Sequence, residues 1–318
     1  MEIRHMHYLV TIAEYRSITR AAEVLYVSQP SLSHCVAKAE AELGAKLFDR
    51  STSPLTLTYA GEKFVDIARQ ILALDGTMQR EFRDISQNMR GRLRVGMPHE
   101  RATFMLPEIM PRFSREYPMV DVIVTTGSRY SLYKGLDRGQ LDFVIVPYRE
   151  DSADYTLLPL AREDLLFIAK KGTLPQEVLI DPGHVDISRT AGLRYVMQRR
   201  DHAIRRHIDD MFAKAGIKPD VAIEAPSNLT KLRLVAAGMG VGIVPRMTLL
   251  FGHCIDEVDV YSIGTGSEMW DIPAIFRNGT YIGVVERRFI QIAAESYRDA
   301  VRRIFHTEMS MPGIDDRT

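Results

Sequence analysis

The sequence predicts an α/β protein that carries an all-α winged helix-turn-helix head. Three observations lead to this fold class. Short helical patterns fill the first 58 residues, one long helical pattern covers 59–89, and strand and helix patterns alternate over 90–306. A chain of 318 residues is expected to form two or three domains. Its apolar share of 46% and charged share of 26% are those of an ordinary globular protein, which excludes a wholly disordered chain, a collagen and a disulfide scaffold.

The net charge does not identify a binding partner, whereas the cysteine content indicates a reducing compartment. The 41 basic and 41 acidic side chains cancel, so net charge alone points to no polyanionic partner. Cys35 and Cys254 lie far apart and match no metal-ligand spacing, so we expect two free thiols, with Cys35 a small buried side chain. The longest uncharged apolar stretch, 234–245, is too short for the ~20 residues of a membrane span. We therefore predict a cytoplasmic protein with no membrane partner, no metal and no cofactor.

The first 58 residues predict three short helices followed by a small wing. Apolar residues recur at helical spacing. Ser17 or Thr19 can cap the second helix, and Ser28 can cap a third helix that has Pro30 in its first turn. Gly44 is expected to end that third helix. A polar, proline-containing loop between two short apolar runs then predicts a two-stranded wing.

The second and third helices follow the helix-turn-helix plan, because a turn of three or four residues joins them. The residues that remain outward on the third helix are Gln29, Pro30, Ser31, Ser33, His34 and Lys38. Glutamine can form a bidentate pair with adenine, and serine hydroxyls can meet bases or phosphates. The alternative is a solvated face in a helical protein-interaction module. For His34, base contact and simple exposure stay open.

The 59–89 pattern predicts a helix of about 45 Å with one apolar seam. Its apolar residues step by three or four, which is close to a coiled-coil a/d seam over four heptads. We expect a second copy of the chain to cover this seam, and the alternative is a helix packed on its own domain. The seam residues are Phe64, Ile67, Ile71, Leu74, Met78, Phe82 and Ile85.

Residues 90–306 predict two α/β subdomains with largely parallel sheets. We place subdomain I at about 91–162 and 267–306, subdomain II at about 163–266, and a polar tail at 307–318. The glycine-rich run 238–242 follows a helix and precedes a strand, the reverse of a nucleotide-binding turn, so we interpret it as a tight helix-to-strand turn.

Ligands of open α/β sheets bind at the carboxyl ends of strands, near helix N-termini. Loops at 98–103, 126–128, 147–148 and 198–200, and the helix start at 228, meet that description. Arg101, Arg199 and Arg200 would suit a carboxylate or phosphate, whereas Glu100 and His99 argue against a purely anionic pocket. Pairing with a nearby acid is the alternative for each arginine. No catalytic triad, P-loop or metal cluster has a recognisable spacing, so we predict that the protein is not an enzyme.

The run RAAEVLYVSQPSLSHCVAKAEAELGAKLFDR, followed by LTLTYAGEKF, resembles the winged helix-turn-helix of the LysR-type transcriptional regulators. The long helix and the two α/β halves match the rest of that family, so the resemblance covers almost the whole chain. It implies that the third helix enters the major groove, and that the C-terminal domain is like a periplasmic binding protein and binds a small-molecule effector.

Two sets of residues follow from these arguments. The expected DNA-binding residues are Thr19, Arg20, Ser28, Gln29, Pro30, Ser31, Ser33, His34, Lys38, Arg50, Ser51 and Thr52. The expected effector-binding residues are Pro98, His99, Glu100, Arg101, Thr103, Thr126, Gly127, Ser128, Pro147, Tyr148, Gln198, Arg199 and Asn228.

This sequence departs from the family pattern at two places. His34 stands where many members have arginine, and the wing sequence STSP lacks basic residues. Residues 1–60 contain six basic and six acidic side chains, so we expect modest nonspecific DNA affinity.

The predicted function is therefore promoter binding by a dimer or tetramer, modulated by an unidentified effector, with RNA polymerase as a further partner. The alternative function is a small-molecule sensor whose helical head binds a protein.

Overall fold

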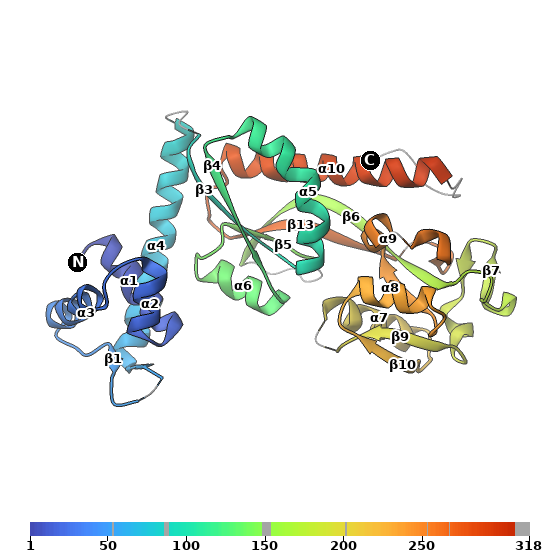
Figure 1. Cartoon of the computed structure of the whole chain (residues 1–318), viewed down its shortest axis with the longest axis horizontal. Helices are drawn as coiled ribbons and strands as arrows, with labels where there is room; N and C mark the ends of the chain where they lie inside the picture. Colours follow the sequence, from blue (N-terminus) through green and yellow to red (C-terminus); the bar gives the residue numbers. More distant parts are fainter. Residues whose placement is uncertain are drawn as a thin grey trace. The chain divides into compact units, whose positions relative to one another are not determined.

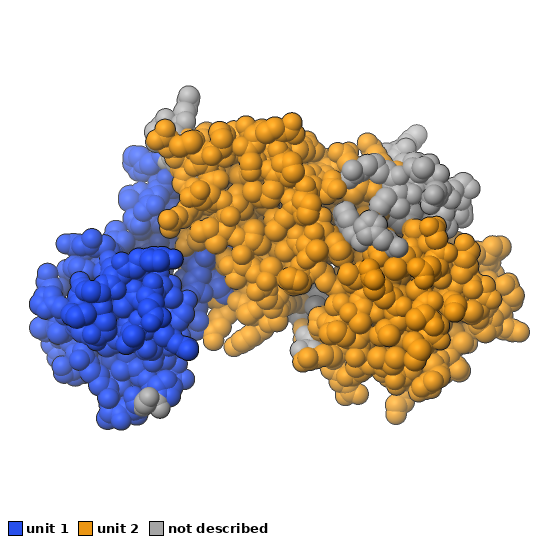
Figure 2. Space-filling model, viewed as in Figure 1, with its two compact units in different colours: residues 1–88, 135–140, 280–283 blue, residues 89–134, 141–279, 284–318 orange. Residues whose placement is uncertain are grey.

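The computed structural model describes residues 1–52, 54–85, 89–147, 154–200, 202–252, 254–266 and 268–308. The chain divides into two compact units, coloured separately in Figure 2. One contains 1–88, 135–140 and 280–283, and the other 89–134, 141–279 and 284–318. Within the described ranges, no helix is long and apolar enough to cross a membrane.

The head of the first unit consists of α1 (Ile3–Tyr15), α2 (Ile18–Leu25) and α3 (Gln29–Leu43), followed by the antiparallel pair β1 (Phe48–Asp49) and β2 (Thr56–Leu57). The predicted caps are confirmed. Ser17 Oγ accepts from Arg20 N at 3.3 Å, Ser28 Oγ accepts from Ser31 N at 3.4 Å, and Gly44 ends α3 with φ of 66°. The predicted wing is the β1–β2 hairpin.

A small apolar core lies between the three helices and the wing. It includes Leu9, Ile12, Leu32 and Val36, all fully buried. The predicted burial of Cys35 is confirmed, with 7% exposure. Burying one stripe of α3 in this core leaves its opposite stripe to solvent.

Helix α4 (Tyr59–Ile85) presents two apolar stripes rather than one. Val65 and Ala68 are buried against Val10 of α1. A second stripe is exposed: Ile67 by 57%, Leu74 by 67%, Met78 by 51% and Phe82 by 63%.

The predicted seam needs one correction. Phe64 packs, partly buried, against the core of the head, because it lies close to the helix start where α1 covers α4. Ile71 is half-buried, and the side chain of Ile85 lies outside the described part.

The second unit is built on a nine-stranded mixed sheet in the order β4-β3-β5-β13-β6-β12-β8-β7, with β11 also paired to β6. Its strands are β3 (Gly91–Met97), β4 (Val120–Thr126), β5 (Phe143–Ile145), β6 (Tyr155–Lys170), β7 (Leu179–Asp181), β8 (His184–Val185), β11 (Gly242–Pro245), β12 (Val258–Ile263) and β13 (Glu268–Arg277). A separate parallel pair contains β9 (Arg194–Gln198) and β10 (Asp220–Ala225).

The prediction of largely parallel sheets is wrong. Strands β4, β3 and β5 are parallel, but β13 runs antiparallel to both β5 and β6, and β11 and β12 run antiparallel to β6. The physical reason is β6, which spans 16 residues and pairs with β13 from Tyr155 to Leu165. The predicted subdomain boundary at 162–163 falls inside this strand, so one strand belongs to both halves.

The helices that begin in this unit are α5 (His99–Glu116), α6 (Arg129–Asp137), α7 (Ala203–Lys214), α8 (Asn228–Ala236), α9 (Arg246–Gly252) and α10 (Val284–Glu308), with short 3-10 turns η1 (Gln176–Val178), η2 (Ile187–Thr190) and η3 (Ile255–Glu257). Helices α5 and α10 lie side by side (Figure 1), where the rings of Phe113 and Phe289 meet edge to face at 5.1 Å. The predicted helix-to-strand turn joins α8 to β11, with φ of 84° at Gly238 and 141° at Gly240.

Helix α10 continues to Glu308, so the predicted start of the tail at 307 lies inside its last turn. Polar residues continue a helix almost as readily as apolar ones, and polarity alone therefore does not mark a helix end.

Candidate functional site

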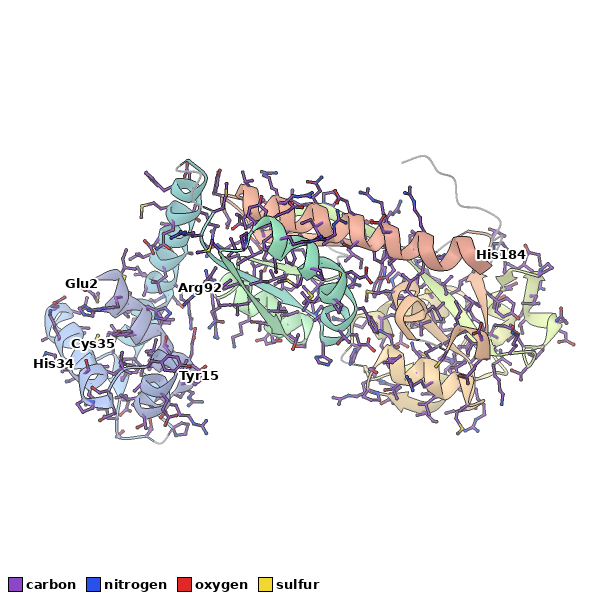
Figure 3. All side chains as sticks on the ribbon, turned by 45° about the horizontal axis from the view of Figure 1, so that its top comes forward. Glu2, Tyr15, His34, Cys35, Arg92 and His184 are labelled. Carbon is purple, nitrogen blue, oxygen red and sulfur yellow. The ribbon has the colours of Figure 1, made fainter. Side chains whose placement is uncertain are left out.

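The outward stripe of α3 contains the side chains that the sequence predicts to meet DNA. Gln29, Ser31, His34 and Lys38 are exposed and Ser33 is half-exposed. Figure 3 labels His34 and its buried neighbour Cys35 on this helix. Gln29 Nε2 donates to Ser33 Oγ at 2.9 Å, one turn along the helix. This bond holds the glutamine amide in place and leaves its oxygen and second N–H group for a base edge.

The remaining predicted DNA-binding residues surround the start of α3. Thr19 and Arg20 are exposed in the first turn of α2, and Ser28 and Pro30 are exposed at the start of α3. In the wing Arg50, Ser51 and Thr52 are exposed, while Ser53 lies outside the described residues.

The wing carries its own negative charge at Asp49. Ser51 Oγ and Ser51 N donate to Asp49 Oδ1 at 2.6 and 2.9 Å, and these bonds lower the pKa of Asp49. The ionised carboxylate beside Arg50 reduces the attraction of the wing for phosphates, in agreement with a head of balanced charge.

A surface hollow of about 460 Å³ beside α2 contains three arginines that the structure brings together: Arg16, Arg20 and Arg50. Arg16 was missed by sequence reasoning. Its backbone oxygen accepts from Leu55 N at 3.1 Å and its Nε donates to Leu55 O at 3.4 Å, so it joins the α1–α2 corner to the wing. In the described part of the chain no carboxylate lies within 4.0 Å of these three guanidinium groups. Such a cluster is suited to a phosphate.

Tyr26, in the turn between α2 and α3, was also missed. Its side chain is 96% exposed and its φ is 54°, a left-handed conformation that bulky residues seldom adopt. The sequence signal was the position itself, between the two helices of the helix-turn-helix.

Glu40 connects the buried side of α3 to the wing. Its Oε1 accepts from Leu47 N at 2.9 Å and Phe48 N at 3.3 Å, and its Oε2 pairs with Lys46 Nζ at 3.0 Å. Burial raises the pKa of Glu40, but the hydrogen bonds from Leu47, Lys46 and Phe48 outweigh burial and hold the pKa below its ordinary value.

We expect the head to lose stability when Glu40 is protonated. Because the pKa is lower in the folded head than the ordinary 4.5, the carboxylate stabilises the fold above pH 4.5, and this contribution is lost as the pH falls through the folded pKa. Glu40→Gln should remove this pH dependence and cost about 1–2 kcal/mol at neutral pH. Hydrogen exchange of the Leu47 and Phe48 amides, corrected for intrinsic rates, measures the stability of the head as a function of pH. Glu23→Gln, at an exposed site, is the control, and an unchanged acid profile in Glu40→Gln would contradict the assignment.

In the second unit, three predicted effector residues form one hydrogen-bonded network. Glu100 at the start of α5 accepts from Asn228 Nδ2 at 2.9 Å and from Leu229 N at 2.8 Å. Asn228 Oδ1 accepts from Gln198 Nε2. Gln198 Oε1 and Ile243 O both accept from Lys231 Nζ.

Lys231 was missed by sequence reasoning, because a lysine in a short helix is normally exposed. It is fully buried, and burial lowers its pKa well below the ordinary value, while the charge of Glu100 opposes that shift.

Arg101 pairs with a nearby acid, which was the alternative to ligand binding that the sequence left open. It is 4% exposed, and its Nη2 pairs at 3.1 Å with Oε2 of Glu163, which is fully buried. Met247 N and Trp270 Nε1 donate to the same carboxylate at 2.8 and 3.3 Å. Arg101 is therefore a structural cation in the interior of the unit, and its guanidinium is not presented to a ligand.

The other predicted effector residues stay near the strand ends. His99, Thr126, Ser128 and Arg199 are exposed, and Pro98, Gly127 and Pro147 are partly buried. Thr103 donates back to His99 O at 3.0 Å, and Ser128 Oγ accepts from Ser131 N at 3.2 Å. Tyr148 lies outside the described residues.

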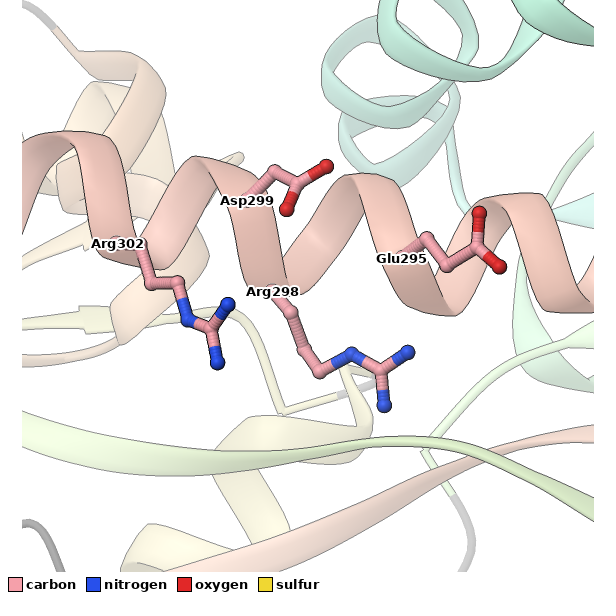
Figure 4. A pocket seen from close by; sticks show the side chains of 4 residues that line it. All are labelled: Glu295, Arg298, Asp299 and Arg302. Atoms are coloured by element: carbon pink, nitrogen blue, oxygen red, sulfur yellow. The ribbon is translucent and has the colours of Figure 1, made fainter. Parts of the chain in front are cut away.

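A second hollow, of about 520 Å³, follows α10 and contains only charged side chains: Glu295, Arg298, Asp299 and Arg302 (Figure 4). Arg112 pairs with Glu295 and, at 3.8 Å, with Asp299. We interpret this hollow as a solvated ion-pair surface. Among the described residues, no group of three His, Cys, Asp or Glu side chains is placed to hold a metal ion.

The fold and the two sites define a regulator that joins a winged helix-turn-helix to a ligand-binding α/β domain. Family models for "Bacterial regulatory helix-turn-helix protein, lysR family" and "LysR substrate binding domain" match residues 3–62 and 86–296. The chain belongs to the LysR family, and it is a DNA-binding transcriptional regulator with an effector-binding domain.

Similar proteins cover nearly the whole chain. The "Uncharacterized HTH-type transcriptional regulator YcgK" of Bacillus subtilis (strain 168) is 28% identical over 312 residues, 94% of this chain and 95% of that one. The "DNA-binding transcriptional dual regulator OxyR" of Escherichia coli (strain K12) is 29% identical over 249 residues, covering 78% and 80%.

Solved structures of other proteins share the fold. A full-length OxyR variant from Pseudomonas aeruginosa, with one cysteine replaced by aspartate, has a TM-score of 0.71 at 24% identity, over 94% of this chain and 95% of that chain. Full-length CbnR complexed with its target DNA has a TM-score of 0.59 at 23% identity, over 93% and 100%.

Proposed function

We propose that this regulator binds promoter DNA sequence-specifically as a dimer or tetramer, and that a small-molecule effector bound between two α/β subdomains modulates the binding. Residues 1–58 form the DNA-binding head, 59–89 the dimerisation helix, and 90–306 the effector domain. The outward stripe of α3 is the observation that carries this proposal, because its polar, exposed side chains surround a helix N-terminus whose other face is buried.

In each head, the N-terminal part of α3 enters the major groove with Gln29, Ser33 and His34 toward the bases. Arg16, Arg20 and Arg50 hold a backbone phosphate in the hollow beside α2. The similarity to CbnR, which was solved with its target DNA, supports this arrangement through the shared fold.

Two copies of α4 cover each other along the exposed stripe Ile67, Leu74, Met78 and Phe82. Four large apolar side chains exposed by half or more along one helix favour such a partner. Pairing places two heads on one dyad-symmetric site, about one helical turn or a multiple apart. Because basic and acidic side chains balance in each head, one head alone attracts DNA weakly, and the contact of the second head is important for affinity.

The effector domain cannot form a disulfide within itself. Several relatives are named hydrogen peroxide-inducible genes activators, and the full-length OxyR structure is that of a cysteine variant. This chain has Cys35 in the head and only Cys254 in residues 90–306, so its effector domain lacks a second thiol for an internal disulfide. Gln198 and the residues bonded to it supply polar contacts instead.

The protein acts in the cytoplasm, as a regulator rather than an enzyme. A change in the shape of the bound DNA would bring it into contact with RNA polymerase. The exposed polar stripe of α3 favours DNA over a protein as the partner of the head, because a helix that docks into a groove of a protein does so with an apolar face.

Fluorescence anisotropy of the full-length protein tests this function. The probe is the DNA upstream of its own gene, with unrelated DNA as competitor, at two salt concentrations. We expect tight, competitor-resistant binding that weakens steeply with salt. Salt-insensitive binding, or equal affinity for both DNAs, would contradict it.

A further inference from the structure

The carboxylate of Glu100 is bound at the start of α8, on another part of the same unit. We call the two donor groups there, Asn228 Nδ2 and Leu229 N, the receptor. Glu100 comes from the first turn of α5, between β3 and β4, and accepts two hydrogen bonds in the first turn of α8. Their lengths of 2.8 and 2.9 Å are those of good hydrogen bonds to a carboxylate. A negative charge at a helix N-terminus is stabilised by the aligned peptide dipoles. Ser227 Oγ caps the same helix by accepting from Thr230 N at 3.0 Å, so Glu100 serves a different backbone group from the cap.

A buried lysine lies behind this receptor. Lys231 is fully buried, and its Nζ donates only to the neutral oxygens of Gln198 and Ile243. Within the described residues no carboxylate lies within 4.0 Å of this nitrogen. Gln198 and Asn228 connect it to Glu100 through a continuous chain of hydrogen bonds. The charge of Glu100 opposes the lowering of the Lys231 pKa by burial, so an anion at the position of the Glu100 carboxylate and a proton on Lys231 stabilise each other.

The same bonds join two parts of the effector domain. Helix α5 packs on β4 and α10, whereas α8 packs on β11 and β9. Glu100, Gln198 and Asn228 are three of the residues expected to bind the effector, so groups expected to receive a ligand are already satisfied by a carboxylate of the chain itself.

We propose that Glu100 is an internal ligand of the effector site, and that the effector which displaces it carries a carboxylate group. This inference rests on the proposed binding of a small molecule by this domain. A carboxylate replaces both bonds that Glu100 accepts. A neutral or cationic ligand would leave the Leu229 N–H group and the Asn228 amide without a charged acceptor. Displacement also releases α5 from α8, which changes the connection between the two parts of the domain while α8 keeps an anion at its N-terminus.

The test is chemical complementation of Glu100→Ala in the full-length protein, with acetate as the probe. Trp270 is the single tryptophan of the chain and lies on β13, so its fluorescence follows thermal unfolding of this unit. We expect Glu100→Ala to lower the unfolding midpoint and acetate to restore it in a saturable manner. Sodium chloride and methylammonium chloride at equal ionic strength should not. Adding Asn228→Ala to Glu100→Ala should abolish the acetate effect.

Glu116→Ala is the matched control. Glu116 lies at the other end of α5 and also accepts two hydrogen bonds, both at 2.6 Å, from Arg288 on the surface. No acetate rescue is expected there. Glu100→Gln keeps the shape of the side chain, should fold if the alanine variant does not, and should bind no acetate because its amide still fills the receptor.

Equal responses of wild type, Glu100→Ala and Glu116→Ala to acetate would overturn the inference, as would an unchanged unfolding midpoint in both Glu100 variants. The experiment contains no DNA. A wild-type protein that fails to bind its promoter therefore refutes the proposed regulator function without deciding the role of Glu100.

Discussion

Replacing Gln29 and Ser33 together by alanine should strongly reduce operator preference while leaving the fold and nonspecific DNA binding intact. Both side chains lie on the outward stripe of α3, and alanine favours a helix, so stability should change little. A good bidentate base contact contributes about 1–3 kcal/mol of discrimination. We therefore expect the affinity ratio between operator and unrelated DNA to fall by about 10–100-fold or more. Anisotropy measures this ratio, and circular dichroism checks the folding.

Arg16→Gln provides the contrasting control. Arg16 lies in the arginine hollow beside α2, away from the reading stripe of α3. Losing one phosphate contact should weaken binding to operator and unrelated DNA alike, and should reduce the slope of log affinity against log salt by about 0.9. If the affinity ratio between operator and unrelated DNA is unchanged by the double substitution, α3 is not the element that reads the sequence.

Arg101→Ala should strongly destabilise the effector unit, even though the sequence placed this residue among the effector contacts. Removing the guanidinium leaves the Glu163 carboxylate buried with two neutral donors and no cation. Breaking a buried ion pair in this way costs about 3–5 kcal/mol. Urea unfolding followed by the fluorescence of Trp270, whose Nε1 donates to Glu163, measures the loss.

Arg199→Ala is the matched comparison, because the same family resemblance assigned it to the effector site. Its side chain is exposed just after the end of β9, so its free energy of unfolding should stay within about 0.5 kcal/mol of wild type. Equal stability of the Arg101 and Arg199 variants would show that the buried pair with Glu163 does not stabilise the unit.

Features whose physical causes lie within a few residues could be predicted from the amino-acid sequence alone. Ser17, Ser28 and Gly44 mark helix ends because each cap satisfies backbone groups of its own helix. Likewise, the periodicity of apolar residues in α4 was readable, since positions three and four apart share a helix face. Together with the helix-turn-helix spacing, these local signals were sufficient for the three helices of the head and the outward stripe of α3.

The meeting of charged residues across the fold, by contrast, depends on tertiary structure. Arg101 and Glu163 are 62 residues apart, and Glu100 meets an α8 residue 128 positions away. Nothing local distinguishes these side chains from surface charges. The length of β6 was hidden in the same way, because Arg162, Glu163 and Asp164 interrupt its apolar pattern and two of them are buried only through distant partners. Long-range pairing determines such positions, since the cost of burying a charge is offset only when the chain brings its partner into place.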